Sequence, residues 1–302
     1  MARQFFHHKL TAALGILFVT LIWGFSYVVT KTAMEAITPL WFAFIRLGTA
    51  ALLLLLLDVS SWRQLTRRCW RDGLVVGIPV GLAECFQIVG LNNTTASNSA
   101  FITGFYVVLV PIIGWFITRR LSGRHLLIAI VALISTAAFS LDGNLQFASG
   151  DLWTLACAVC FAVQYNMLGI HAPKYSGMLF TAVQLAVAAV VSLIAACCFE
   201  PLPTAASFTP RVIWSLLFSI VGVIAVGYTI QTEAQKVLPA TTASVLFTAE
   251  CIFGALCGIL FLGDRFIVRQ VIGGVVMIAC MVCSILLAEQ MPASRQPEEK
   301  TA

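Results

Sequence analysis

Arg46, Glu84 and Glu250 are the residues with most potential for chemistry, because each is the single charged residue of a long apolar stretch. An ionised side chain facing lipid at a helix centre costs about 2.5–3.5 kcal/mol, so we expect these three to face one another or a hydrated cavity. One arginine can neutralise only one carboxylate. We therefore expect the other glutamate to bind a substrate amine or a proton. In the alternative interpretation, an Arg46–carboxylate pair only locks helices together.

Polar and aromatic residues recur around these charges. An ungapped offset of 144 aligns residues 84–134 with 228–278, so that Glu84 matches Tyr228 and Tyr106 matches Glu250. Each half of the sequence then supplies a glutamine, a glutamate and a tyrosine, which predicts one shared binding cavity with hydrogen-bonding walls. The expected substrate-binding and transport-path residues are Trp23, Tyr27, Arg46, Glu84, Gln87, Tyr106, Gln164, Tyr228, Gln231 and Glu250.

The elements that carry these residues are apolar segments of membrane-spanning length. The chain is 60% hydrophobic and 10% charged, with a mean hydropathy of +0.96. A soluble domain is about one quarter charged, so a membrane is the expected surrounding. Most segments reach the roughly 17–25 residues that a helix needs to cross the hydrocarbon, and none shows the alternation of barrel strands. They run approximately over residues 10–30, 39–57, 73–91, 96–118, 125–141, 152–170, 175–199, 212–232, 240–262 and 270–288.

The three charges are expected at one depth in the membrane. Arg46 lies 11 residues from Leu57, Glu84 lies 11 residues from Gly73, and Glu250 lies 10 residues from Ala240. At about 1.5 Å per helical residue, each charge is about 15–16 Å from the same membrane face. This depth places the expected cavity near the middle of the bilayer.

The chain divides around the polar segment 142–151 into two halves with five apolar stretches each. Because five is an odd number, the halves must have opposite orientations, which is typical of secondary transporters. We therefore predict an all-α membrane protein of ten transmembrane helices in two inverted five-helix repeats. The first repeat would span 1–141 and the second 150–290, followed by a disordered cytoplasmic tail at 291–302.

Charge predicts the orientation. With both termini in the cytoplasm, 13 Lys and Arg residues lie on the inner side and 4 on the outer side. This asymmetry follows the positive-inside rule and favours a multi-pass protein of the cytoplasmic membrane. The basic residues are scattered over short loops, so we expect no nucleic-acid partner.

Small residues and prolines indicate how the helices pack and bend. Gly73, Gly77 and Gly81 recur every four residues, a spacing that lets helix backbones approach closely in lipid. Pro79 and Pro111 fall inside the third and fourth apolar stretches, where we expect them to interrupt the helices.

No residue cluster points to catalysis, a metal or a cofactor. The cysteines lie mostly in apolar segments, where they are expected to act as packing residues. The four histidines lie outside the stretches or at their ends, and neither H-E-x-x-H nor G-x-S-x-G is present. We therefore expect neither an enzyme nor a cofactor.

Four segments resemble motifs of a known family: IWGFSYVVTK at 22–31, FAFIRLGTAALLLLL at 42–56, GLNNTTASNSAFITGFYVVLVP at 90–111 and AECIFGALCGILFLGDR at 249–265. Together they resemble EamA-type members of the drug/metabolite transporter superfamily. The resemblance implies two inverted five-helix repeats and transport of small metabolites, often export of amino acids. Cys251 stands where the family often has proline and Asp264 where it often has glutamate, so we expect little bending at Glu250.

These observations favour a secondary transporter that works by alternating access on small metabolites, most of all an exporter of amino acids or related compounds. The expected partners are a small-molecule substrate and the lipid bilayer, with protons considered as the coupling ion. The alternatives are a passive channel, a structural membrane protein and a membrane-embedded enzyme.

Overall fold

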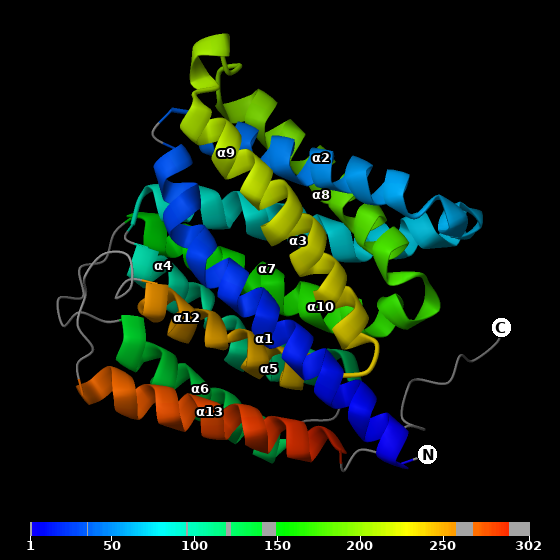
Figure 1. Ribbon diagram of the computed structural model, residues 1–302, viewed down its shortest axis with the longest axis vertical. Coiled ribbons are helices and arrows are strands. Elements are labelled where there is room, and N and C mark those ends of the chain that lie inside the picture. Colours follow the sequence, from blue (N-terminus) through cyan, green and yellow to red (C-terminus); the bar gives the residue numbers. More distant parts are fainter. Residues whose placement is uncertain are drawn as a thin grey trace.

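The computed structural model describes residues 2–34, 36–94, 96–118, 122–140, 149–257 and 268–289, and these residues form helices and short connections (Figure 1). The α-helices are α1 (Ala2–Ala33), α2 (Pro39–Leu57), α3 (Arg67–Asn92), α4 (Ala96–Thr103), α5 (Tyr106–Thr118), α6 (Gly123–Ser140), α7 (Ser149–His171), α8 (Gly177–Phe199), α9 (Pro210–Phe218), α10 (Gly227–Gln235), α11 (Ala240–Phe247), α12 (Ala249–Cys257) and α13 (Val268–Glu289). Short 3-10 turns are η1 (Val59–Gln64), η2 (Ala172–Lys174) and η3 (Ala205–Ser207), and η4 (Ser219–Val226) is a π-helical segment between α9 and α10.

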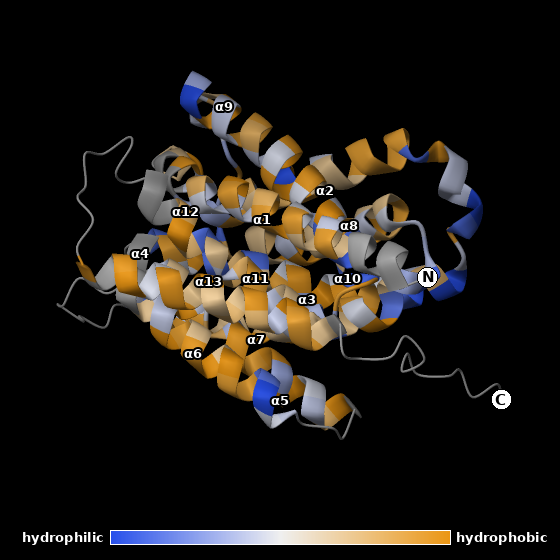
Figure 2. Cartoon of the chain, turned by 60° about the horizontal axis from the view of Figure 1, so that its bottom comes forward, coloured by the Kyte–Doolittle hydropathy of each residue, from blue (hydrophilic) through white to orange (hydrophobic). Residues whose placement is uncertain are grey.

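Eight of the described helical segments are long and apolar enough to cross a membrane, and Gly123–Ala137 and Ala240–Phe253 are shorter apolar helices. The outer helix faces carry exposed leucine, isoleucine and valine side chains, for example Leu52, Ile134 and Val275. Figure 2 shows hydrophobic residues along most of these surfaces and hydrophilic residues gathered at connections such as the one before α9. The chain is therefore a multi-pass membrane protein. The prediction of ten spans in inverted repeats stays a prediction.

Helices from the two halves of the chain interleave. From the first half, α1 packs on α10 and α12. From the second half, α7 packs on α3 and α5. The pairs α2 with α8, α5 with α11 and α6 with α13 also join the halves. Figure 1 shows α2, α3 and α8 together on one side of the molecule and α6 with α13 on the other. The buried core consequently includes side chains from both halves.

The glycine stripe explains the close contact between α3 and α8. A Cβ at position 77 would lie 2.5 Å from the carbonyl oxygen of Gln184, and one at position 81 would lie 2.7 Å from Cβ of Val191. Real side chains do not tolerate these distances, so the two backbones approach only because both positions are glycine.

Reciprocal caps hold the ends of the antiparallel pair α2 and α8. Glu200, which follows α8, accepts hydrogen bonds from the backbone N–H of Leu40 at 3.0 Å and of Trp41 at 3.2 Å, in the first turn of α2. Asp58, which follows α2, accepts a 2.6 Å hydrogen bond from the hydroxyl of Ser176, just before α8. Because the first turn of a helix has unsatisfied N–H groups and a partial positive charge, a carboxylate there is stabilising.

Two expectations about helix boundaries are wrong. The apolar stretch predicted from residue 73 begins as a helix at Arg67, because Thr66 accepts a hydrogen bond from the N–H of Cys69 and caps the helix. Arginines 67, 68 and 71 thus lie on the first turns of α3. Pro79 and Pro111 both lie inside continuous helices, α3 and α5.

The fourth and ninth apolar stretches are instead interrupted elsewhere. The fourth breaks at Gly104 and Phe105, between α4 and α5, and the ninth breaks at Thr248, between α11 and α12. Thr248 uses its hydroxyl to donate a 2.6 Å hydrogen bond to the carbonyl of Val245, which satisfies a backbone acceptor at the break. This local hydrogen bond supports an interruption of the helix near Glu250 without proline. The expectation of little bending at Glu250 stays a prediction.

Candidate functional site

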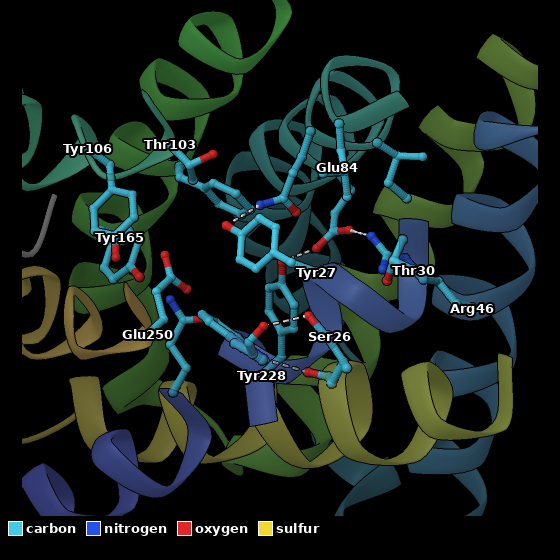
Figure 3. Close-up of a pocket in the computed structure, with 17 residues that line it drawn as sticks. Ser26, Tyr27, Thr30, Arg46, Glu84, Thr103, Tyr106, Tyr165, Tyr228 and Glu250 are labelled. Atoms are coloured by element: carbon cyan, nitrogen blue, oxygen red, sulfur yellow. Dashed lines mark hydrogen bonds and ion pairs between the residues drawn. The ribbon is translucent and has the colours of Figure 1, made fainter. Parts of the chain in front are cut away.

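One cavity of about 50 Å³ lies between the helices of both halves, and the three charges of the apolar stretches converge on it (Figure 3). Its lining comes from α1, α2, α3, α4, α5, α7, η4, α10 and α12. Nine of the ten candidate residues line this cavity: Trp23, Tyr27, Arg46, Glu84, Gln87, Tyr106, Tyr228, Gln231 and Glu250. The tenth, Gln164, is fully buried and accepts a 3.3 Å hydrogen bond from Gln231.

Arg46 and Glu84 form a buried ion pair on one side of the cavity, with each residue only 3% exposed. Tyr228 donates a 2.5 Å hydrogen bond to the other oxygen of the Glu84 carboxylate. This arrangement joins α2, α3 and α10 and compensates the negative charge of Glu84 within the protein. Hydrogen bonds to its remaining polar atoms offset the cost of burying such a pair, and Tyr228 supplies one of them to the carboxylate.

Glu250 is the second carboxylate of the cavity and is 5% exposed. Across the described ranges of the chain, no Lys, Arg or His forms an ion pair with it. Figure 3 shows Glu250 beside Tyr106 and Tyr165, across the cavity from Arg46. The interruption at Thr248 precedes it by two residues, so Glu250 enters the cavity from the first turn of α12.

Aromatic rings form much of the wall near Glu250. Trp23 stacks on Phe247 with ring centroids 4.9 Å apart, and Tyr106 stacks on Tyr165 at 5.2 Å. The edge of Tyr165 meets Phe247 at 5.5 Å, which connects the two stacks. These contacts fix the rings and leave a cavity wall that is apolar but electron-rich.

Trp23 also reaches the irregular segment of the neighbouring helix. Its indole N–H donates a 3.0 Å hydrogen bond to the carbonyl of Val223 in η4. Close approach of the two helices requires glycine at 227, since a Cβ there would lie 2.5 Å from Nε1 of Trp23. π-helical segments are uncommon and often occur at functional sites.

Glutamine side chains extend the polar wall. Gln87 donates a 3.3 Å hydrogen bond to the hydroxyl of Tyr27. Gln231 contacts Gln164 and Gln235, and Gln235 donates to the carbonyl of Tyr165 at 2.9 Å. The cavity therefore has a neutral hydrogen-bonding wall in addition to its charged groups.

Several lining residues were not among the candidates. Ser26 and Thr30 lie on the same face of α1 as Trp23 and Tyr27, so helical spacing could have identified them. Thr103 follows Ser99 at the spacing of one helical turn on α4, and Thr103 lines the cavity while Ser99 is buried. Ile88, Leu91, Phe161 and Val223 add apolar surface, which no sequence signal separates from ordinary packing.

A second polar cluster lies outside the cavity, between α3 and η2. Asp72 is 3% exposed and accepts a 3.0 Å hydrogen bond from Tyr175, with His171 at 3.1 Å and Lys174 at 3.5 Å. Burial, together with the hydrogen bond to Asp72, raises the pKa of Tyr175 to about 12. The tyrosine hydroxyl therefore remains a donor, and the cluster ties the two halves together at this end of the molecule. Among the described residues, no group of three His, Cys, Asp or Glu side chains could hold a metal ion.

Comparison with known proteins agrees with this architecture. The sequence pattern of the EamA-like transporter family matches residues 10–141 and 148–286. The chain belongs to the EamA-like transporter family. The two matched segments fall on either side of residues 142–147.

Similar proteins include an uncharacterized transporter of Archaeoglobus fulgidus, 28% identical over 278 residues, which cover 92% of this chain and 87% of the relative. The uncharacterized transporter YvbV of Bacillus subtilis is also 28% identical, with 92% of each chain covered. One protein of known crystal structure aligns with a TM-score of 0.73 at 16% identity, covering 92% of this chain and 97% of that chain, and this likeness concerns the fold. The chain is thus a membrane protein of a transporter family.

Proposed function

We propose that this protein is a secondary transporter that exports amino acids or related small metabolites across the cytoplasmic membrane by alternating access. The observation that carries the proposal is the cavity between the helices of both halves, on which all three charged residues of the apolar stretches converge. Ion pairing in the core of a membrane protein is costly to build, and polar groups there usually mark a substrate or ion path.

The arrangement of contacts supports two inverted repeats with boundaries near 1–141 and 150–290. If α1 corresponds to α7, then the packing of α1 on α10 and α12 corresponds to the packing of α7 on α3 and α5. The breaks at Gly104 and Thr248 are 144 residues apart, which is the offset that aligns the two halves. Interrupted helices at corresponding positions are typical of transporters whose site lies at the repeat interface. Residues 291–302, the proposed cytoplasmic tail, lie outside the described residues.

The proposed orientation has both termini in the cytoplasm. The first and last described helices begin and end at the same side of the molecule, where the Lys9 ammonium donates a 2.6 Å hydrogen bond to the carbonyl of Ala288. The exposed arginines at the start of α3 would lie on this cytoplasmic side, in agreement with the positive-inside rule.

In this proposal the two glutamates have different roles. Glu84 would hold Arg46 and Tyr228 in place, whereas Glu250 would bind the substrate or a coupling proton. Movement between inward and outward access would bend the helices at the interruptions described above, since irregular backbone is where a membrane helix can change direction.

Counterflow in proteoliposomes tests the proposal. Vesicles preloaded with an unlabelled mixture of amino acids and amines should accumulate a labelled member of that mixture transiently and saturably. Glu84→Gln and Glu250→Gln should reduce the rate at least about tenfold, while Glu233→Gln, which alters an exposed carboxylate on the surface, should leave it unchanged. Linear, non-saturable flux would indicate a channel. Absence of flux for every compound would favour a structural role.

A further inference from the structure

The charge balance of the cavity is uneven. Its described lining contains one basic residue, Arg46, and two carboxyl groups, those of Glu84 and Glu250. Arg46 is already paired with Glu84, and Tyr228 supplies that carboxylate with a further hydrogen bond. The cavity thus has one carboxyl group without a cationic partner in its described lining, Glu250, and no unpaired cation there.

The surroundings of Glu250 suit an organic cation. Its carboxylate is close enough to the hydroxyls of Tyr27, Tyr106 and Tyr165 to act on them electrostatically. Trp23 and the stacked pair Tyr106–Tyr165 line the same cavity, and Phe247 stacks on Trp23. Rings of this kind attract a cation placed over their faces, and the attraction is stronger when the cation is desolvated.

A substrate that carries a carboxylate group is poorly matched to this cavity. An amino acid would bring a second negative group into a space whose arginine already has a carboxylate partner. Binding it would require Arg46 to separate from Glu84, and breaking one side of a buried pair leaves an uncompensated charge. An amine without a carboxylate avoids this cost, because its ammonium group neutralises Glu250 and its body contacts the rings.

On the basis that the cavity is the substrate site of the proposed transporter, we propose that the cavity narrows the class of amino acids and related metabolites to the related amines. It selects protonated primary amines that carry an aromatic or branched aliphatic body and no carboxylate. Glu250 is the ligand of the ammonium group, and the rings of Trp23, Tyr106 and Tyr165 enclose the body. The Arg46–Glu84 pair excludes substrates that bear an anion.

Equilibrium binding to the purified full-length chain tests this proposal without requiring flux. Isothermal titration in detergent would compare phenethylamine with phenylalanine, and isobutylamine with valine, so that the members of each pair differ by one carboxylate. 3-Phenylpropionate and 2-phenylethanol serve as the anionic and neutral analogues. Each amine should bind at least about tenfold more tightly than its amino acid, and the two analogues should bind more weakly than phenethylamine.

Two variants assign the ammonium site. Glu250→Gln keeps the shape of the side chain and should weaken amine binding at least about tenfold. Glu233→Gln removes an exposed carboxylate and should leave binding unchanged. The inference is overturned if the amino acids bind as tightly as the amines, if neither amine binds, or if Glu250→Gln binds amines like the unaltered protein.

The outcomes separate this inference from the proposed function. Amine binding without counterflow would refute transport while keeping the amine site. Saturable counterflow of amino acids without amine binding would keep transport and refute the amine site.

Discussion

Tyr228 donates a hydrogen bond to Glu84, the residue 144 positions before it, and this separation equals the offset that aligns the two halves of the sequence. The same offset relates Tyr106 to Glu250, which lie together on the other side of the cavity (Figure 3). Tyrosine and glutamate have exchanged places between the halves. As a result one glutamate has an arginine partner, whereas the other has no ion-pair partner among the described residues and lies beside tyrosine rings.

The buried ion pair should be sensitive to loss of one partner. Arg46→Met leaves the Glu84 carboxylate without its counter-charge, and we expect it to lower the free energy of unfolding by about 3–5 kcal/mol. The double variant Arg46→Met with Glu84→Gln removes both charges and should recover part of that loss. Reversible unfolding in detergent measures both values. If the double variant loses as much free energy of unfolding as the two single substitutions together, the two charges do not interact.

The contact between α3 and α8 should depend on the glycines of α3. Gly77→Ala places a methyl group 2.5 Å from the carbonyl oxygen of Gln184, so we expect a loss of about 1–3 kcal/mol in the free energy of unfolding. Gly169→Ala is the matched control on α7, where a Cβ has nothing within 4 Å and alanine favours the helix. Equal behaviour of the two variants in thermal unfolding would contradict the close packing seen here.

The indole of Trp23 should stabilise the π-helical segment. Trp23→Phe removes the N–H that donates to Val223 while keeping a ring, and we expect a loss of about 1 kcal/mol or more. The exposed indole of Trp62, which donates to the carbonyl of Leu55 at 2.9 Å, provides the control, because water can replace its hydrogen bond. If Trp62→Phe costs as much as Trp23→Phe in thermal unfolding, the contact with η4 has no special role.

Asp58 should make the free energy of unfolding depend on pH. Partial burial opposes its ionisation, but hydrogen bonds from Ser176, Ser61 and Ser60 hold its pKa below the ordinary value of 3.8. The stabilisation from charged Asp58 is therefore complete above the unfolded-state pKa and is lost as pH falls through the lower folded-state pKa. Between about pH 5 and about pH 3, the melting temperature should fall more for the unaltered protein than for Asp58→Asn. If the melting temperatures of the two proteins fall in parallel over this pH range, the hydrogen bonds do not stabilise the charged form of Asp58.

The convergence of Arg46, Glu84 and Glu250 could be predicted because lipid makes an isolated charge so unfavourable. The free energy of burying a charge constrains these residues more strongly than any local propensity does. Gln87 followed from its spacing relative to Glu84, whereas Trp23 and Tyr27 were included as polar and aromatic residues of the first apolar stretch. The sequence did not show which of the two glutamates pairs with Arg46, because the expected depths of Glu84 and Glu250 are nearly equal. Only the packing of α2 on α3 decides between them.

Helix boundaries were less predictable, since they depend on single hydrogen bonds. Thr66 extends α3 beyond its apolar stretch to the arginines, which hydropathy alone assigns to a loop. The hydroxyl of Thr248 supports a break where proline is absent, whereas Pro111 sits within a continuous helix. In membrane helices, neighbouring groups can satisfy the backbone around a proline, so its presence does not locate the interruption.

The reciprocal caps of α2 and α8 have a consequence for biosynthesis. The amide groups of Leu40 and Trp41 are synthesised 160 and 159 residues, respectively, before the glutamate that accepts from them. Asp58 likewise precedes its serine partner by 118 residues. While the ribosome is still making the second half, the first half is in the membrane with open helix ends. Each half of the nascent protein therefore supplies the carboxylate that caps a helix of the other half.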